Sequence, residues 1–181
     1  AVNLKGITLN KREGNKGIRI AETPSGMINS IGLENPGIEY FKDNIIKNIK
    51  YKAPIILNIN GESEEEYIKI SEIANEIERV DFIELNISCP NVKNGGMAFG
   101  INCKTAENLT KSVKKILTKK PLIVKLSPNV TDITEIAKAV ENAGANAVSL
   151  VNTFLAMKID TKTKKPLLGN IFGGLSGGCI K

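Results

Sequence analysis

Apolar residues occur along the chain in short runs that are separated by amphipathic segments. The runs are rich in isoleucine, leucine and valine and have the length of buried β-strands. They are Pro54–Asn60, Asp81–Ile87, Pro121–Ser127 and Asn146–Asn152. Each gap between them holds a segment with helical periodicity. This alternation of strands and helices predicts an α/β fold with a parallel sheet.

The helical segments carry recognisable start signals. A capping box, Ser-Glu-Glu-Glu, begins an expected helix over about residues 63–78. Two further helices are expected near residues 104–117 and 132–144, the second with an aspartate at its start. Nearer the N-terminus, Asn35 is the expected N-cap of a helix over roughly residues 37–49.

The remaining segments have weaker patterns. Residues 2–5 resemble the end of a strand, residues 158–166 a hairpin and residues 167–171 a further strand. The turn-rich stretch 23–37 is typical of an irregular connection. The glycine-rich stretch 172–178 is typical either of a simple turn or of a loop whose backbone approaches a ligand closely.

Polar side chains mark the C-terminal ends of the expected strands. They are Asn58, Asn60, Asn86, Lys125 and Asn152. In a (β/α)8 barrel these ends converge on one mouth, where the active site lies. An open doubly wound sheet binds at a switch point and needs no polar group on successive strands. The polar strand ends therefore favour a (β/α)8 TIM barrel over an open sheet.

Composition narrows the function classes. The chain has 181 residues, 41% of them hydrophobic, which is typical of a single globular domain, here residues 1–181. The net charge of +6 comes from lysines that are scattered among glutamates, and aromatic residues make up only 4%, so nucleic-acid binding is not expected. No apolar run is long enough for a membrane span and no signal peptide begins the chain, which favours a cytoplasmic protein without a membrane partner.

The sequence contains no histidine and three cysteines at irregular spacing. Three irregularly spaced cysteines suit a reducing compartment, and no metal site is expected. Without histidine, a general base must be a carboxylate, cysteine, lysine or tyrosine. Cys89 lies just after an expected strand, between a serine and a proline, on a loop that ends in a glycine pair. That position suits chemistry, although most free cysteines are inert packed thiols.

Five stretches together resemble the class 1 dihydroorotate dehydrogenases, and they are most similar to the NAD-linked type, class 1B. In chain order they are NSIGLENPG, NISCPNVKNGG, VKLSPNVTDI, VNTF and GGLSGG. The resemblance covers nearly the whole chain. It implies a (β/α)8 barrel that binds FMN at its C-terminal mouth and oxidises dihydroorotate to orotate in pyrimidine (UMP) biosynthesis.

The resemblance also implies roles for individual residues. Cys89 would be the general base that removes a proton from C5 of dihydroorotate while C6 gives hydride to the flavin, and a thiol of lowered pKa suits that step. Lys125 would stabilise negative charge on the reduced flavin. Positions that match substrate contacts are Lys5, Asn29, Ser30, Ile31, Gly32, Leu33, Asn86, Asn152 and Thr153. Positions that match flavin contacts are Lys5, Gly6, Asn58, Asn86, Lys125, Val151 and Gly177.

The class 1B resemblance further implies a homodimer and a partner subunit that carries FAD and an iron–sulfur cluster and passes electrons to NAD. No segment of this chain has the cysteines for such a cluster. The chain departs from its relatives at Gly178-Cys179, where they tend to have Pro-Ala, and it stops before the expected strands 7 and 8 with their phosphate-binding loops. Because a barrel of this class takes about 250 residues, the resemblance implies an incomplete (β/α)8 TIM barrel that lacks the first strand and the last strands.

Two alternatives remain open. One is the pyrimidine-reducing domain of a dihydropyrimidine dehydrogenase, which has a similar cysteine loop, although NSIGLENPG favours dihydroorotate dehydrogenase. The other is a non-catalytic fragment or paralogue that acts as a binding or assembly module. The retention of Cys89, Lys125 and the asparagines argues against lost function.

Overall fold

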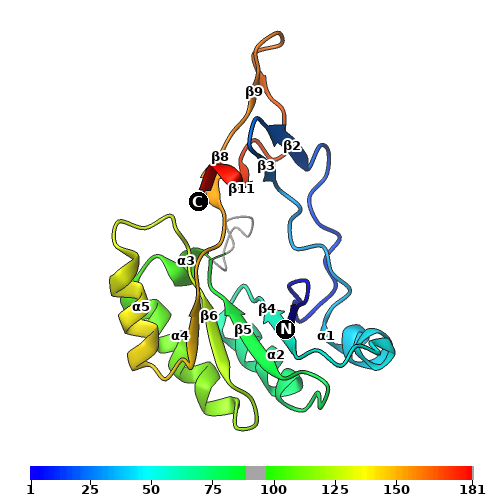
Figure 1. The fold of residues 1–181 in the computed structure, drawn as a ribbon, viewed down its shortest axis with the longest axis vertical. Coiled ribbons are helices and arrows are strands. Elements are labelled where there is room, and N and C mark those ends of the chain that lie inside the picture. The colour runs from blue at the N-terminus through cyan, green and yellow to red at the C-terminus, as the bar shows by residue number, and fades with distance from the viewer. Residues whose placement is uncertain (89–96, 181) are drawn as a thin grey trace.

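A parallel sheet forms one half of the molecule (Figure 1). The computed structural model describes residues 1–88 and 97–180. The strands, in spatial order, are β1 (Val2–Asn3), β4 (Ile55–Ile59), β5 (Phe82–Asn86), β6 (Leu122–Lys125) and β7 (Ala147–Ser149). All neighbours in this sheet are parallel. The predicted α/β class and the predicted strands are confirmed, with slightly shorter bounds.

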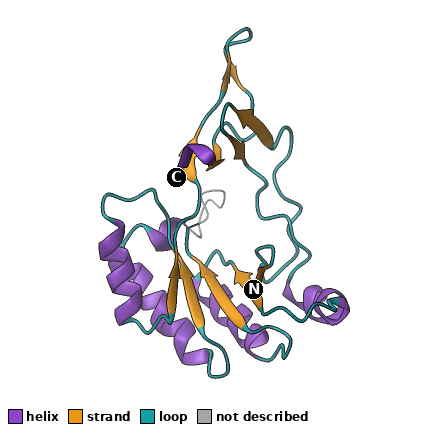
Figure 2. Cartoon of the chain, viewed as in Figure 1, coloured by secondary structure: helices purple, strands orange, loops and turns teal. Residues whose placement is uncertain are grey.

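Three longer helices cover one face of this sheet (Figure 2). They are α2 (Glu64–Asn75), α4 (Cys103–Ile116) and α5 (Ile133–Asn142), and a short α3 (Met97–Gly100) precedes α4. Each longer helix is capped by a side chain that accepts a backbone N–H, namely Ser63, Asn102 and Asp132. The predicted start signals at Ser63 and Asp132 are confirmed. Within the described residues, no helix combines the length and apolarity that a membrane crossing needs.

The prediction for the first helix was partly wrong. Residues 38–48 are helical, but they divide into α1 (Ile38–Tyr40), the π-helical η1 (Phe41–Ile45) and the 3-10 helix η2 (Ile46–Asn48). The N-cap is Gly37 rather than Asn35. The Asn35 Oδ1 accepts from the backbone N–H of Gly37 at 2.9 Å and of Thr8 at 3.2 Å, so this side chain joins the helix start to the preceding loop.

Successive side chains of the central parallel strands point alternately toward the core and toward the cavity. Outward residues such as Leu57, Leu85 and Val124 are fully buried against the helices. Their neighbours Asn58, Asn86 and Lys125 point to the opposite face, because successive side chains of a strand alternate. In β4, β5 and β6 the apolar side chains on one face therefore pack against the helices, and polar side chains on the other face are free to line a binding site.

A second sheet lies beyond the C-terminal ends of the parallel strands (Figure 1). It is antiparallel, and its strands are, in spatial order, β2 (Ile20–Thr23), β3 (Gly26–Asn29), β11 (Gly173–Gly177) and β8 (Phe154–Ala156). The expected hairpin is confirmed as β9 (Ile159–Asp160) with β10 (Lys165–Pro166), and a 3-10 helix, η3 (Gly178–Ile180), follows β11.

Three expectations for this region were wrong. The stretch 23–37 is not wholly irregular, because β3 pairs with β2 and with β11. Residues 167–171 do not form a strand, and the glycine-rich stretch after them does. The glycines serve close packing within the protein: a Cβ atom at Gly174 would lie 2.0 Å from Thr153 Oγ1, and one at Gly173 would lie 2.5 Å from the Asn29 carbonyl oxygen.

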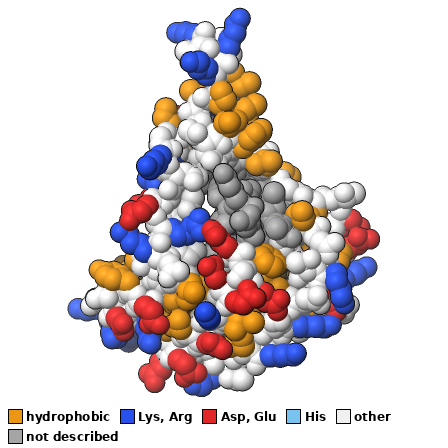
Figure 3. All heavy atoms as spheres, turned by 180° about the vertical axis from the view of Figure 1, so that it is seen from behind, with side chains coloured by type: hydrophobic (Ala, Val, Ile, Leu, Met, Phe, Trp, Pro, Cys, Tyr) orange, Lys and Arg blue, Asp and Glu red, His pale blue; other side chains and the backbone are white. Residues whose placement is uncertain are grey.

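The antiparallel sheet has a much smaller core than the parallel one. Its fully buried apolar residues are Ala21, Ile28 and Leu168. Many of its apolar side chains are exposed, and Figure 3 shows apolar side chains on this part of the surface. They include Ile18, Ile20, Met27, Phe154, Leu155, Met157, Ile159, Ile171 and Phe172. Burial of apolar area therefore stabilises the parallel half far more than this sheet.

Lys120 is a buried cation whose effect on stability should depend on pH. Its side chain is 9% exposed and its ammonium donates to the backbone oxygens of Ile77, at 2.9 Å, and Val80. Burial lowers the pKa of Lys120, although Asp81 and Glu76 act in the opposite direction. Between this lowered pKa and the ordinary lysine pKa of about 10.4, the unfolded state binds more protons than the folded state. The free energy of unfolding should therefore rise with pH across that window.

As the pH rises toward about 10.4, we expect the free energy of unfolding of the unaltered protein to increase relative to that of Lys120→Met. Urea denaturation of the flavin-free complete protein at several pH values measures it. Lys115→Met, at an exposed lysine of α4, is the control and should show no such trend. A constant difference for Lys120→Met would contradict the expectation.

Candidate active site

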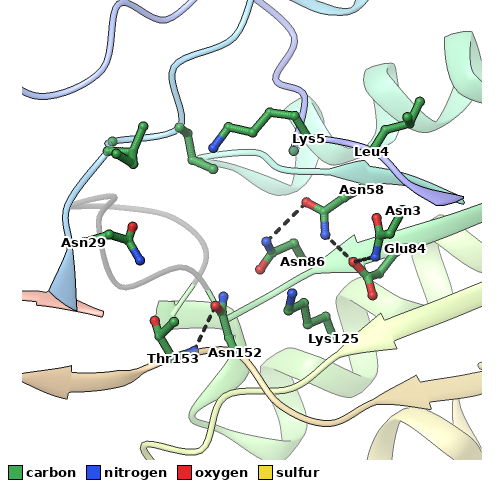
Figure 4. A pocket seen from close by; sticks show the side chains of 14 residues that line it. Asn3, Leu4, Lys5, Asn29, Asn58, Glu84, Asn86, Lys125, Asn152 and Thr153 are labelled. Carbon is green, nitrogen blue, oxygen red and sulfur yellow. Dashed lines mark hydrogen bonds between the residues drawn. The ribbon is translucent and has the colours of Figure 1, made fainter. Parts of the chain in front are cut away.

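A cavity of about 420 Å³ opens at the C-terminal ends of the parallel strands (Figure 4). This volume is within the usual range for a small-molecule site. Its walls come from β1 and the loop after it, from β3 and the loop after it, from β4, β5 and β6, and from the segment between β7 and β8. The lining residues are Asn3, Leu4, Lys5, Gly6, Asn29, Ile31, Gly32, Leu33, Asn58, Glu84, Asn86, Lys125, Asn152 and Thr153.

Most of the predicted site residues meet at this cavity, although they come from segments far apart in the sequence. Those that line it are Lys5, Gly6, Asn29, Ile31, Gly32, Leu33, Asn58, Asn86, Lys125, Asn152 and Thr153. Ser30, Val151 and Gly177 do not line it. The predicted base Cys89 lies outside the described residues. The cavity is therefore where the structure brings the predicted substrate and flavin positions together.

The three predicted residues outside the lining have other surroundings. Ser30 is fully buried, and its hydroxyl has no hydrogen-bond partner among the described residues. Val151 follows β7 and is 36% exposed. Gly177 pairs with Gly26 at the end of the antiparallel sheet, where a Cβ atom would lie 2.5 Å from the Gly26 Cα atom. Their roles toward a ligand stay predictions.

Asn3, Leu4 and Glu84 line the cavity and were not expected from the sequence. Glu84 could have been found, because it is a charged residue inside the apolar segment DFIELNI, just as Lys125 is inside PLIVKLS. Asn3 could have been found from its spacing, since it lies two residues before Lys5 and shares its side of an extended segment.

A chain of hydrogen bonds crosses the floor of the cavity (Figure 4). The Glu84 carboxylate accepts from the Nδ2 groups of Asn3, at 3.0 Å, and Asn58. The Asn58 Oδ1 accepts from the Nδ2 groups of Asn86, at 3.2 Å, and Asn60, at 2.8 Å. These side chains are buried apart from Asn3, so each is held in one orientation.

Backbone groups hold the other end of this chain. The Asn86 Oδ1 accepts from the backbone N–H and the hydroxyl of Ser88, at 3.2 and 3.0 Å. The Ser88 hydroxyl accepts from the Asn152 Nδ2 at 3.0 Å, and the Asn152 Oδ1 accepts from the Thr153 N–H at 2.9 Å. From α2, the Tyr67 hydroxyl donates to the Asn86 backbone oxygen at 2.7 Å. The helix layer thus fixes the strand end that carries Asn86.

Two ammonium groups and one carboxylate, those of Lys5, Lys125 and Glu84, line the cavity. Neither lysine is in an ion pair with a carboxylate of the described residues. Lys125 lies beside Asn86 in the register of the sheet. Cations that are not neutralised by the protein favour a ligand with negative charge or with many acceptor atoms. Across the described ranges, no group of three or more His, Cys, Asp or Glu side chains is placed to hold a metal ion.

Comparison with known proteins agrees with this geometry. The family model described as dihydroorotate dehydrogenase matches residues 1–181. The chain belongs to the dihydroorotate dehydrogenase family. The parallel sheet with its helices is accordingly part of a (β/α)8 barrel, and the prediction of an incomplete TIM barrel is confirmed.

Several curated proteins of this family are similar over the whole chain. The catalytic subunit of dihydroorotate dehydrogenase B (NAD(+)) from Brachyspira hyodysenteriae is 82% identical over 181 residues, which are 100% of this chain and 60% of that protein. The subunits of the same name from Porphyromonas gingivalis and Desulforamulus reducens are 54% and 51% identical, over 100% of this chain and 59% and 60% of theirs. The chain therefore spans about three fifths of the length of these relatives.

Proposed function

We propose that the protein that contains this chain oxidises dihydroorotate to orotate in pyrimidine biosynthesis, with FMN and substrate bound at the described cavity. The observation that carries the proposal is the convergence of Lys5, Asn58, Asn86, Lys125 and Asn152 on one cavity. Of these positions, Asn86, Lys125 and Asn152 come from three separate motifs, and each motif resembles the same family. The names of the relatives, at 51 to 82% identity, favour dihydroorotate over the substrates of a dihydropyrimidine dehydrogenase.

The lining fits a flavin. The amides and lysines offer hydrogen-bond donors for carbonyl oxygens, ring nitrogens and phosphate. At Gly6 the backbone itself borders the cavity, and a Cβ atom there would lie 2.6 Å from Asn60 Nδ2 and 2.8 Å from Asn58 Oδ1. Lys5, Gly6, Asn58, Asn86 and Lys125 would hold the FMN, as the family resemblance implies.

When bound, FMN supplies the acceptor for the hydride that leaves C6 of dihydroorotate. Residues of this chain would remove the proton, orient the substrate and stabilise the negative charge. Cys89, assigned from its motif, takes the proton from C5, so that the C5–C6 single bond becomes a double bond. Asn29, Asn86 and Asn152 orient the pyrimidine through amides that can both donate and accept. The Lys125 ammonium favours the negative charge that builds up in the site during transfer.

The relatives are named as catalytic subunits of dihydroorotate dehydrogenase B (NAD(+)), and we propose that electrons pass to NAD here as well. A partner subunit with FAD and an iron–sulfur cluster would carry electrons from the FMN to NAD. The catalytic subunit would form a homodimer in the cytoplasm, and residues 1–181 would be part of one FMN-binding barrel domain.

The test is an absorbance spectrum of the complete protein with FMN, recorded anaerobically before and after addition of dihydroorotate. We expect bound flavin whose visible absorbance bleaches. Dihydrouracil, which lacks the carboxylate, is the control and should leave the flavin oxidised. Bleaching by dihydrouracil instead would favour a dihydropyrimidine dehydrogenase, and the absence of bound flavin would contradict the proposal.

A further inference from the structure

We infer that Glu84 is a positioning residue that fixes the Asn58 amide, so that Asn58 and Asn86 offer N–H groups rather than oxygens to the ligand of the cavity. Glu84 is 2% exposed and lines the cavity. Its Oε2 atom accepts from both Asn3 Nδ2 and Asn58 Nδ2. An ionised carboxylate only accepts hydrogen bonds, so the group that faces it must be a donor.

Asn58 has one orientation that satisfies its neighbours. Its Nδ2 faces the Glu84 carboxylate, and its Oδ1 faces two donors, Asn60 Nδ2 and Asn86 Nδ2. Turning this amide over would place its oxygen against the carboxylate and its N–H groups against the Asn86 Nδ2, whose own orientation is fixed because the Asn86 Oδ1 accepts from the Ser88 backbone N–H. Asn58 is 5% exposed, so water would not relieve these contacts.

Most hydrogen-bonding groups of the Asn58 and Asn86 amides already have partners within the protein. Each asparagine amide has two N–H groups and an oxygen with two lone pairs. Both lone pairs of Asn58 and both of Asn86 are used by donors within the described part of the chain. Asn58, Asn86 and Asn152 each spend one N–H, on Glu84, Asn58 and Ser88. The hydrogen-bonding capacity that remains on Asn58 and Asn86 is therefore N–H alone.

Next to Asn58 and Asn86, the cavity therefore selects a ligand edge that is rich in acceptors, such as carbonyl or carboxylate oxygens or ring nitrogens without hydrogen. The two lysines of the lining favour the same edge by charge. FMN and orotate both carry edges of this kind. The ligand in this inference rests on the proposed function, whereas the orientation of Asn58 does not.

The first test is FMN affinity, followed by fluorescence quenching as the complete, flavin-free protein is titrated. Glu84→Leu keeps a buried side chain but removes the acceptor, and its Kd for FMN should rise about tenfold or more. Glu84→Gln can still accept with its oxygen, so it should bring the Kd back to within about threefold of the unaltered value. Asn75→Leu is the matched control, because Asn75 is 6% exposed and its Oδ1 accepts from the Lys119 N–H away from the cavity.

Three outcomes would overturn the inference. The first is an unchanged Kd for FMN in Glu84→Leu. The second is a loss of FMN affinity in Glu84→Gln as large as that in Glu84→Leu, which would assign the effect to charge. The third is an equally large loss in Asn75→Leu, which would assign the effect to general destabilisation. If the unaltered protein binds no FMN, the proposed function fails, and the orientation is then decided by a measurement that needs no ligand.

That measurement is hydrogen exchange of the Asn58 side-chain amide in protein labelled with 15N-asparagine, with the signal assigned by its absence in Asn58→Asp. Exchange should be slow in the unaltered protein and in Glu84→Gln, and about tenfold faster or more in Glu84→Leu, because the donor has lost its acceptor. Equal exchange in all three proteins would overturn the role of Glu84.

Discussion

Cys89→Ala in the complete protein is expected to lower the turnover of dihydroorotate by about 10²- to 10⁴-fold, the usual contribution of a general base. Flavin binding should be unaffected, because the residues proposed to hold FMN lie on the strand ends and on the loop after β1. Cys89 is outside the described residues, so this expectation rests on its motif, NISCPN.

The measurement is anaerobic stopped-flow reduction of the bound flavin by dihydroorotate. Cys103→Ala and Cys179→Ala are the matched controls, since Cys103 is half-buried at the start of α4 and Cys179 is exposed. Both should reduce the flavin at the unaltered rate. The rate in the unaltered protein should also increase with pH until the Cys89 thiol is ionised, and this increase should be missing in Cys89→Ala. A Cys89→Ala rate within a few-fold of the unaltered rate would remove Cys89 from the role of base.

Lys125→Met should either leave the site without FMN or lower the reduction potential of the bound FMN by about 30 mV or more, which corresponds to roughly 1.4 kcal/mol for a two-electron couple. The physical reason is the loss of a cation that is not paired within the described residues and that faces the cavity beside Asn86. Reduction adds negative charge to the flavin, and a nearby ammonium stabilises the reduced form more than the oxidised form.

An anaerobic redox titration of the complete protein measures this potential. The control is Lys115→Met, which removes a lysine at the exposed end of α4 and should leave both the FMN content and the potential unchanged. A normal potential in a fully loaded Lys125→Met protein would mean that Lys125 does not face the flavin.

The order of strands and helices in the parallel half could be predicted from the sequence because it depends on local patterns. Short apolar runs such as PIILNIN have the length and the β-branched content of buried strands, and the helical segments between them indicate a sheet that is covered by helices. Caps such as Ser63 and Asp132 act on the next few backbone N–H groups, so they can be recognised without knowledge of the rest of the fold. The polar residues at the strand ends then indicated one binding mouth, and Asn58, Asn86, Lys125 and Asn152 do line one cavity.

The antiparallel sheet could not be predicted in the same way. Its strands β3 and β11 are short and contain glycine, and they are stabilised by pairing between residues almost 150 positions apart, such as Ile28 with Leu175. No local sequence pattern indicates which distant residue a strand will pair with. The glycines Gly173 and Gly174 allow β11 to approach Asn29 and Thr153 closely.

The class of fold, the family and most of the residues around the cavity could be inferred from the sequence alone, because they follow from local periodicity and from motifs. How those residues act on one another depends on the folded structure. Glu84 gives no sign in the sequence of which amide it meets, and its bond to Asn58 exists because β4 and β5 are neighbours in register. Hydrogen-bond direction in a buried network depends on which groups face each other across strands, and that is set by packing rather than by sequence order.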